Sequence, residues 1–218
     1  MRKDGSQDFS FIENVFENAN KGPIYIIKST ILPGSTKKLQ NKFNELDIVF
    51  SPEFLTERKA KLDMLTQSRI ILGGEKDLID DVELLYLKRF KNRHIIKTDS
   101  KTAELVKYMN NTFFATKVSI MNEFKMLSDL VGANWEDALH GFASDGRIGD
   151  SHLNVPGHDG KLGYGGTCFP KDVSSLINFS RDLGLMLNTL EAGWKTNLEV
   201  RPEKDWENKI GRSITKKK

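Results

Sequence analysis

Four short apolar runs divide the first 98 residues of the chain, and the segments between them have helix-forming or turn-forming sequences. Runs of four or five residues of this kind are typical of strands that are buried in a parallel sheet. Strands that alternate with helices at this spacing predict βαβ units, and therefore an α/β fold with a parallel sheet. We expect strands at residues 24–28, 47–50, 69–72 and 94–97, and helices at residues 10–20, 35–45 and 76–91.

Two polar clusters directly follow the first two predicted strands. One is Ser29-Thr30, and the other extends from Ser51 to Glu57. Open α/β sheets bind ligands outside the carboxyl ends of their strands, so both clusters are candidate binding residues. Taken singly, each cluster is more typical of ordinary turn and capping residues. Two clusters at the same edge of one sheet favour a ligand site at that edge.

Residues 99–130 contain neither proline nor glycine, and this composition predicts one long helix. Lys107 and Asn111 lie four residues apart on it and therefore share a face. Phe114 and Val118 continue along the same side, so two polar groups interrupt a mostly apolar stripe. The usual interpretation of such a pair is the rim of a helix in water. The alternative is that both side chains point into a site where this helix meets the segment around the single cysteine.

The chain contains one cysteine, Cys168, within the sequence LGYGGTCFPKDV. Pro170 suits the first turn of a helix and Asp172 adds a carboxylate near its positive end, so Cys168 is predicted just before a helix N-terminus. That position and the neighbouring Lys171 favour the reactive thiolate. The glycine-rich run 163–166 lets the preceding backbone approach a ligand closely. A lone cysteine is more often a small buried hydrophobe, and this interpretation stays open beside the nucleophile.

A long loop separates the helices of the second half of the chain. Residues 145–166 contain seven glycines and little apolar content, and loops longer than about 12–15 residues tend to be functional or disordered. We divide the chain into an α/β domain over residues 1–98, a helical domain over residues 99–212 and a solvated basic tail over residues 213–218. Helices of the second domain are predicted at residues 99–130, 134–142, 171–183, 187–200 and 202–211.

Composition and charge argue against several classes of protein. The net charge of +3 is the small difference between 33 basic and 30 acidic residues, so no nucleic-acid partner is indicated. A single cysteine excludes an internal disulfide framework and suits a reducing compartment. No stretch reaches the ~20 apolar residues of a membrane helix, and the first residues lack the apolar run of a signal peptide. We expect a soluble, cytoplasmic protein without a metal site, because the four histidines lack metal-ligand spacing.

The segment around Cys168 is also similar to a known family. The sequence GYGGTCFPKD resembles the nucleophile motif of the UDP-glucose/GDP-mannose dehydrogenases, and the phenylalanine after the cysteine resembles that of the UDP-glucose 6-dehydrogenases. Further similar segments follow one another in the family's order along nearly the whole chain. They are DGSQDFSFIE, KSTILPGST, SPEFLTERKA, SRIILGG, AELVKYMNNTFFATKVSIMNEF, GRIGDSHLNVPG and NLEVR.

The chain departs from the family pattern at both ends. The family begins with a strand, a GxGxxG turn and a helix that hold the pyrophosphate of a dinucleotide, and this chain has no GxGxxG. The family also ends with a further Rossmann-like domain, and this sequence stops where that domain would start. The resemblance therefore implies the C-terminal half of an NAD-binding Rossmann-like domain at residues 1–98, followed by an all-helical central dimerisation domain with a long connecting helix.

The resemblance implies an NAD-dependent oxidation of a nucleotide sugar, from UDP-glucose to UDP-glucuronate. The family oxidises C6 of the hexose from alcohol to acid with two hydride transfers to NAD. Cys168 would capture the intermediate aldehyde as a thiohemiacetal, and the second transfer would give a thioester that water hydrolyses. Lys107 would stabilise the developing oxyanion, and Asn111 would orient an oxygen beside it.

The resemblance assigns roles to several further residues. Asp172, with Thr30 nearby, would hold the water that accepts the alcohol proton, and Glu53 would be the general base for hydrolysis of the thioester. Arg147 would reach the substrate of a neighbouring subunit, so the implied form is a homodimer across the helix at residues 99–130. The resemblance places Thr30, Glu57, Lys171 and Arg201 beside NAD, and Glu53, Phe54, Leu55, Lys107, Asn111, Arg147, Tyr164 and Gly165 at the sugar.

Other interpretations remain open at the level of sequence. The chain could be a non-catalytic remnant or a dimerisation module of such an enzyme. A weaker alternative is a cysteine-dependent enzyme of another type, such as an acyl transferase. The sugar rests on analogy with the motif after Cys168, so GDP-mannose and a UDP-aminohexose are alternatives to UDP-glucose.

Overall fold

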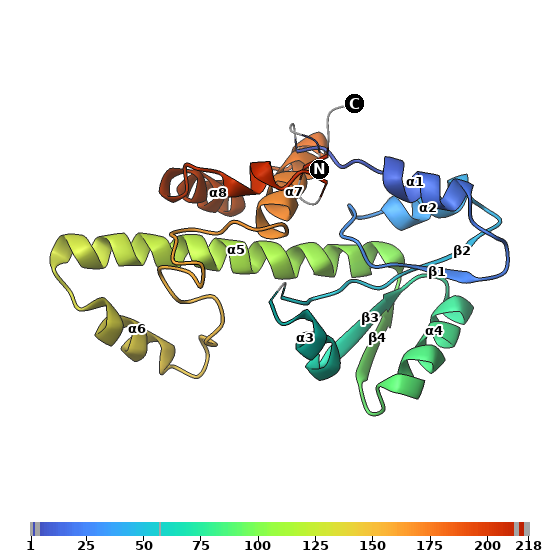
Figure 1. The fold of residues 1–218 in the computed structure, drawn as a ribbon, viewed down its shortest axis with the longest axis horizontal. Helices are drawn as coiled ribbons and strands as arrows, with labels where there is room; N and C mark the ends of the chain where they lie inside the picture. Colours follow the sequence, from blue (N-terminus) through green and yellow to red (C-terminus); the bar gives the residue numbers. More distant parts are fainter. Residues whose placement is uncertain (1, 3–4, 57, 212–213, 216–218) are drawn as a thin grey trace. The chain divides into compact units, whose positions relative to one another are not determined.

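The computed structural model describes residues 2, 5–56, 58–211 and 214–215 and divides the chain into two compact units (Figure 1). We call residues 7–109 the sheet unit, and residues 1–6 together with 110–218 the helical unit. The chain passes between them after Ser6 and again after Met109. The elements are α1 (Ser10–Glu17), β1 (Ile24–Ile27), α2 (Ser35–Lys42), β2 (Asp47–Phe50), α3 (Ala60–Thr66), β3 (Arg69–Gly73), α4 (Lys76–Arg89), β4 (His94–Thr98), α5 (Ser100–Val131), α6 (Trp135–Ala143), α7 (Phe169–Asp182), α8 (Asn188–Val200) and the 3₁₀ helix η1 (Asp205–Asn208).

The four predicted strands are present and form one sheet in the order β1-β2-β3-β4. β1 and β2 pair in parallel, with Ile27 beside Phe50, and β3 and β4 also pair in parallel, with Arg69 beside His94. The α/β class is therefore confirmed, and the long helix predicted after the last strand is present as α5.

The prediction of a wholly parallel sheet is wrong between β2 and β3. These strands pair antiparallel, through Phe50 and Gly73. A parallel connection needs a crossover segment that packs on the sheet, whereas antiparallel strands do not. The connection from β2 to β3 contains α3, a helix that the sequence analysis did not predict, and none of its residues is buried. Because α3 does not cover the sheet, this connection is not a crossover unit.

Side chains of the central strands alternate between two apolar cores of the sheet unit. Ile48 and Phe50 of β2 and Ile71 of β3 pack in one core with α1, α2 and the first turns of α5. Val49 of β2 faces the other side and packs in a second core with α4. Figure 1 shows α1 and α2 on one face of the sheet and α4 on the other. Burial on both faces explains why the strands are continuous apolar runs rather than alternating ones.

The sheet unit continues past residue 98, the predicted domain limit, because Ala103 belongs to the first core.

The helical unit is built around the part of α5 that begins at Asn110. On one side of it, α7 and α8 pack through a core that includes Val173 and Leu190, and α6 lies on the other side (Figure 1). The predicted loop at residues 145–166 contains no helix or strand, and its Leu153 and Val155 pack against Met121 of α5. The loop is therefore a folded part of this unit.

The boundaries of the predicted helices agree with the structure to within three residues, except near the C-terminus, and α1 and α2 each end three residues early. Asn134 caps α6 by accepting hydrogen bonds from the backbone N–H groups of the next turn, as its position predicts. The helix predicted over residues 202–211 is wrong, because only η1 forms there. Arg201 precedes a proline, which disfavours helical backbone, and Lys204 has a φ of 44°. Among the described residues, no helix has the length and apolar character needed to cross a membrane.

Candidate active site

The two polar clusters of the sheet unit lie at the same edge of the sheet, as predicted. β1 and β2 are parallel and end together at Ile27 and Phe50, and the backbone N–H of Ser51 donates to the carbonyl of Ile27 at 2.9 Å. Thr30 and Glu53 therefore both follow strand carboxyl ends. This is the edge at which open α/β sheets bind their ligands.

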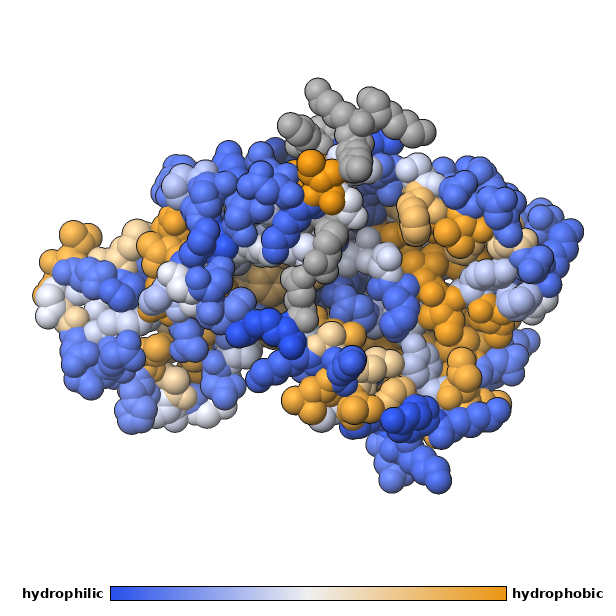
Figure 2. Space-filling model, viewed as in Figure 1, coloured by the Kyte–Doolittle hydropathy of each residue, from blue (hydrophilic) through white to orange (hydrophobic). Residues whose placement is uncertain are grey.

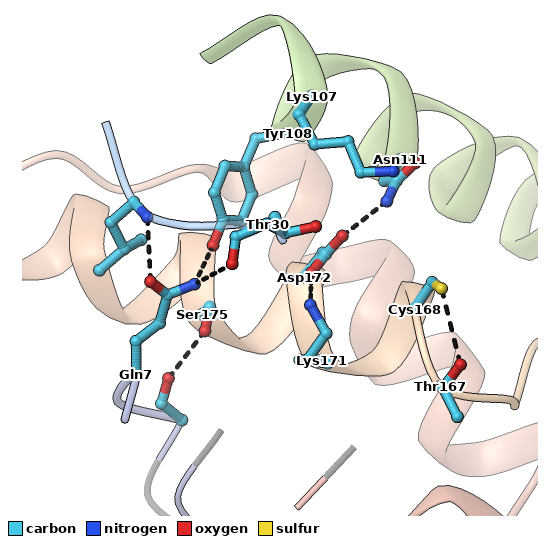
Figure 3. A network of polar contacts seen from close by, with 12 residues as sticks. Gln7, Thr30, Lys107, Tyr108, Asn111, Thr167, Cys168, Lys171, Asp172 and Ser175 are labelled. Atoms are coloured by element: carbon cyan, nitrogen blue, oxygen red, sulfur yellow. Dashed lines mark hydrogen bonds and ion pairs between the residues drawn. The ribbon is translucent and has the colours of Figure 1, made fainter. Parts of the chain in front are cut away.

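Gln7 holds the turn that contains Thr30. Its Nε2 donates to the carbonyl oxygen of Thr30 at 3.3 Å and to the hydroxyl of Tyr108 at 2.7 Å, and its Oε1 accepts from the N–H of Leu32 at 2.9 Å (Figure 3). One amide thus ties both sides of the turn to α5. The sequence analysis missed Gln7 and Tyr108, since nothing local in the sequence indicates partners 23 and 101 residues away.

Lys107 is buried in the sheet unit, and its ammonium group faces Glu53. The side chain is 4% exposed, and Nζ donates to the carbonyl oxygen of Glu53 at 2.5 Å and lies 3.5 Å from its Oε1. The ring of Phe54 lies 5.3 Å from the same nitrogen. The other carboxylate oxygen of Glu53 accepts from the N–H of Leu55 at 2.7 Å. The interpretation of Lys107 as a rim residue in water is therefore wrong.

Asn111, one helical turn further along α5, has its partner in the helical unit. Its Nδ2 donates to Oδ2 of Asp172 at 2.6 Å, and the ammonium of Lys171 pairs with Oδ1 of the same carboxylate (Figure 3). Asp172 is fully buried, and its N–H donates to the carbonyl of Cys168 at 2.9 Å in the first turn of α7. A buried carboxylate in contact with an amide and an ammonium is an arrangement that can order a water or a hydroxyl group.

Cys168 is exposed and occupies the N-cap position of α7, so the prediction of a cysteine just before a helix N-terminus is confirmed. The helix begins at Phe169, and Pro170 is its second residue. The sulfur lies 3.6 Å from the hydroxyl of Thr167 (Figure 3). The interpretation as a small buried hydrophobe is therefore wrong. The helix N-terminus supplies a positive field at the sulfur, whereas the ammonium of Lys171 is engaged by Asp172.

Tyr164 and Gly165 lie in the segment that leads to the cysteine, and α8 fixes this segment. The side chain of Asn197 accepts from the N–H of Tyr164 at 2.7 Å and donates to its carbonyl at 3.1 Å. Burial raises the pKa of the Tyr164 phenol above its usual value. A Cβ atom at Gly165 would lie 2.5 Å from Oδ1 of Asp205, so this glycine permits a close approach of backbone and side chains.

Arg201 is buried and uses its donors within the helical unit. It pairs with Asp159 and with Asp205, each at 2.7 Å, and donates to the carbonyl of Leu162 at 3.3 Å. Burial alone would lower the pKa of Arg201, but the hydrogen bonds to the two carboxylates outweigh it and raise that pKa. These contacts tie the loop at residues 145–166 to the end of α8. The predicted role of Arg201 beside NAD stays a prediction.

The remaining predicted residues lie apart from these contacts or outside the described residues. Arg147 is exposed and pairs with Asp145, through Nε at 3.0 Å and Nη2 at 2.6 Å, and these hydrogen bonds lower the pKa of Asp145. Glu57 lies outside the described residues. In the part of the chain that the structure describes, no group of three or more histidine, cysteine, aspartate or glutamate side chains could hold a metal ion.

The sequence analysis also missed Glu104, a fully buried carboxylate on α5. It accepts from the N–H groups of Gly34 and Thr36 at 2.5 and 2.7 Å and from the Thr36 hydroxyl at 2.6 Å. These groups lie at the N-terminus of α2, so Glu104 caps that helix from 68 residues away.

Two family models match the chain. The NAD binding domain of the UDP-glucose/GDP-mannose dehydrogenase family matches residues 1–88, and the central domain of the same family matches residues 101–199. The first match covers most of the sheet unit. The second covers α5 to α8, including the segment around Cys168.

Curated relatives and solved structures agree with these matches. A UDP-glucose 6-dehydrogenase of Campylobacter jejuni is 41% identical over 175 residues, which cover 78% of this chain and 43% of the relative. A UDP-glucose 6-dehydrogenase of Rickettsia conorii is 33% identical over 193 residues, which cover 87% of this chain and 44% of the relative. The structure of a UDP-glucose dehydrogenase from Pyrobaculum islandicum has a TM-score of 0.79 and 27% identity, and the match covers 90% of this chain and 48% of that one. The chain therefore spans less than half the length of each of these relatives.

Proposed function

Because the chain belongs to the UDP-glucose/GDP-mannose dehydrogenase family, we propose that it forms the catalytic core of an NAD-dependent nucleotide-sugar dehydrogenase. The observation that carries the proposal is the position of Cys168, an exposed thiol at the N-cap of α7, four residues before a buried carboxylate. A thiol at a helix N-terminus is suited to nucleophilic catalysis. UDP-glucose is the substrate we propose, since the two curated relatives are named UDP-glucose 6-dehydrogenases.

The sheet edge fits part of NAD. Thr30 and Glu53 follow the carboxyl ends of the neighbouring strands β1 and β2, at the edge where dinucleotides bind in α/β sheets. We propose that Thr30, which follows the carboxyl end of β1, adjoins the reactive end of the cofactor, with Glu57, Lys171 and Arg201 as further predicted contacts. When bound, NAD supplies the oxidising power for both steps, as the acceptor of two hydrides in turn.

The residues of the chain carry the covalent step. The sulfur of Cys168 attacks the aldehyde carbon at C6 and forms a C–S bond, and the carbonyl oxygen becomes an alkoxide. We assign Asn111 and Lys107 to this oxygen, because an amide and an ammonium on consecutive turns of a buried helix face can stabilise negative charge. Asp172 is proposed to hold a water that takes the proton of the C6 alcohol, with Thr30 assisting.

Glu53 is the proposed base for the last step. Its carboxylate accepts a proton from the water that attacks the thioester carbon, and the C–S bond breaks to release the thiolate of Cys168. The ammonium of Lys107 lies 3.5 Å from that carboxylate and so adjoins the proposed base. Phe54, Leu55, Tyr164 and Gly165 are proposed to contact the sugar nucleotide.

We further propose that the protein forms a homodimer through α5. Several large apolar side chains of this helix are exposed, and Figure 2 shows apolar surface over its C-terminal end. Patches of this kind are typical of protein–protein interfaces. Arg147, whose side chain is 89% exposed, is the residue proposed to reach the partner's substrate. The exposed large apolar residues in the helical-unit part of α5 are Phe113, Ile120, Phe124, Met126, Leu127, Leu130 and Val131.

The test is NADH formation, followed by absorbance, when the protein is mixed with NAD and UDP-glucose, GDP-mannose or a UDP-aminohexose. We expect NADH with UDP-glucose, and loss of the acid product in Cys168→Ala. The matched control is Thr167→Val, which changes the neighbouring residue and leaves the thiol.

Absence of NADH with every sugar would contradict the dehydrogenase. The alternative, a non-catalytic remnant or dimerisation module, predicts a dimer by light scattering without any NADH. Acid product from Cys168→Ala at the wild-type rate would contradict the covalent step alone.

A further inference from the structure

The ring of His152 lies between two phenylalanine rings of the helical unit. Its centroid is 4.3 Å from that of Phe114 on α5, with an interplanar angle of 18°, and 5.5 Å from that of Phe169, with an angle of 44°. Phe169 is the first residue of α7 and directly follows Cys168. The imidazole therefore packs against the residue that directly follows the thiol in the chain.

The imidazole packs against aromatic rings while one of its nitrogens lacks a hydrogen bond. Its Nδ1 is buried and has no hydrogen-bond partner among the described residues. Buried polar side-chain atoms usually have a partner, because an unpaired one carries its full cost of desolvation. His152 also has a φ of 63°, a left-handed backbone that is uncommon outside glycine, so the loop holds the ring at this place.

The charged groups around the ring oppose its protonation. Lys117 of α5 and His158 of the loop are the cationic groups that act on it, and the ammonium of Lys117 stays in place through carbonyl oxygens at 3.3 and 2.8 Å. On α7, the titratable groups of the first turn are the thiol of Cys168 and the Lys171–Asp172 pair. Burial first, and then the charges of Lys117 and His158, lower the pKa of His152 below its usual value of 6.5.

We propose that His152 is a positioning residue for the nucleophile: its neutral ring holds Phe169, and thereby Cys168, at the N-terminus of α7, and protonation of the ring releases them. A proton on the imidazole would place a partly buried cation against two phenylalanines and near Lys117, with no acceptor for the buried Nδ1 among the described residues. The ring would then move towards water, Phe169 would lose its contact, and the first turn of α7 would fray. This inference rests on the proposed function only in taking Cys168 to be the nucleophile.

The experiment measures the rate at which iodoacetamide alkylates Cys168, the single cysteine of the chain, from about pH 5 to about pH 8. The reference is His152→Phe, which keeps an aromatic ring between Phe114 and Phe169 and removes the titration. The ratio of the wild-type rate to the reference rate cancels the thiol's own ionisation.

We expect a ratio near one above neutral pH that falls as the pH drops through the titration of His152. If the N-terminus of α7 frays away from the sulfur, the ratio of alkylation rates should decrease about two- to fivefold, since the interaction of a charge with a helix terminus is worth about 0.3–1 kcal/mol. His140→Phe, at an exposed position on α6, is the matched control and leaves the profile of the wild type unchanged. A ratio that stays constant over the whole range overturns the proposal.

A second measurement covers the case in which His152→Phe does not fold. In the wild type, NMR follows the imidazole C–H signals of His152 and the backbone amide of Phe169 during a pH titration. The proposal is supported if both signals change with the same midpoint, at a pH below the usual pKa of 6.5 for histidine. It is overturned if the amide signal of Phe169 does not change while His152 titrates. Neither measurement uses NAD or a sugar, so failure here leaves the dehydrogenase proposal standing, and absence of dehydrogenase activity leaves this inference testable.

Discussion

Among the residues that the structure describes, each unit buries one carboxylate completely, and the two carboxylates differ in the groups that donate hydrogen bonds to them. Glu104 of the sheet unit accepts two backbone N–H groups and one hydroxyl at the start of α2. Asp172 of the helical unit accepts the amide of Asn111 and the ammonium of Lys171, which are both side chains. Both carboxylates lie on helices, and both side chains are 0% exposed.

The donors indicate the role of a buried carboxylate better than its burial does. Backbone N–H groups at a helix N-terminus are fixed by the fold, so Glu104 can lose them only if α2 frays. Side-chain donors can rotate and can be shared with a ligand, so Asp172 can change partners during a reaction without unfolding its helix. We therefore propose that Glu104 serves stability and Asp172 serves chemistry, and each proposal can be tested separately.

The largest expected effect is that of Glu104→Ala on the free energy of unfolding. The substitution leaves two N–H groups and a hydroxyl of α2 without an acceptor, and buried unpaired groups cost about 1–3 kcal/mol each. We expect a loss of about 3–5 kcal/mol in denaturant-induced unfolding. The matched control is Glu75→Ala, since Glu75 is exposed at the N-cap of α4 and makes no side-chain capping bond. A loss below about 1 kcal/mol for Glu104→Ala would remove the distinction between the two carboxylates.

Asp172→Asn should affect the reaction more than the fold. The amide has nearly the same volume and can still bond Asn111, but it leaves the ammonium of Lys171 without its ionic partner. We expect a loss of about 1–3 kcal/mol of unfolding free energy and a decrease in turnover of about a hundredfold, the scale of general acid–base catalysis. Asp182→Asn, at the other end of α7, controls for helix charge. Unchanged turnover in a folded Asp172→Asn protein would refute the assignment to chemistry.

The contribution of Glu104 to stability should decrease as the pH rises, which is the opposite of the usual behaviour of a carboxylate that is paired in the folded state. Burial raises the pKa of Glu104 above 4.5, and the hydrogen bonds from Thr36 and Gly34 only partly oppose this. A raised pKa means that the folded protein keeps a proton that the unfolded chain has released. The resulting stability is fully present below about pH 4.5 and is lost as the pH rises through the raised pKa.

Glu104→Gln, which cannot ionise, isolates this contribution. The unfolding free energy of the wild type, relative to this variant, should fall as the pH rises from mildly acidic to neutral. The opposite slope would mean that the folded state favours the ionised carboxylate.

The sequence predicted those features that adjacent residues determine. The strands, α5 and the N-cap position of Cys168 follow from apolar runs, from the absence of glycine and proline, and from the sequence CFPKD. The direction of β3 did not follow, because alternating strands and helices do not encode whether a connection crosses over. The last predicted helix failed at the Arg201-Pro202 step.

The missed residues share a different property, which is the sequence distance to their partners. Glu104 has the composition and position of an ordinary helix residue, and only the fold brings it to Gly34, 70 residues away. Gln7 contacts Tyr108 across 101 residues. His152 was seen only as a histidine without metal-ligand spacing, and its stacking on Phe114 depends on the path of a 22-residue loop. Polar contacts between residues so far apart leave no periodic pattern in the sequence, unlike helices and strands.

Substitution of Tyr108 tests whether the stability that Glu104 provides depends on its charge and its backbone N–H donors, or only on its burial as a polar group. Tyr108 is fully buried, and its hydroxyl accepts from Gln7, a neutral amide that holds the Thr30 turn. Tyr108→Phe leaves Gln7 able to bond the Thr30 carbonyl, so we expect a loss of only about 0.5–1 kcal/mol of unfolding free energy. Tyr25→Phe, which removes an exposed hydroxyl bonded to the carbonyl of Asn20, should cost less. If Tyr108→Phe lowers the unfolding free energy as much as Glu104→Ala does, the loss does not depend on which groups donate to the buried acceptor. The contrast drawn between Glu104 and Asp172 then fails.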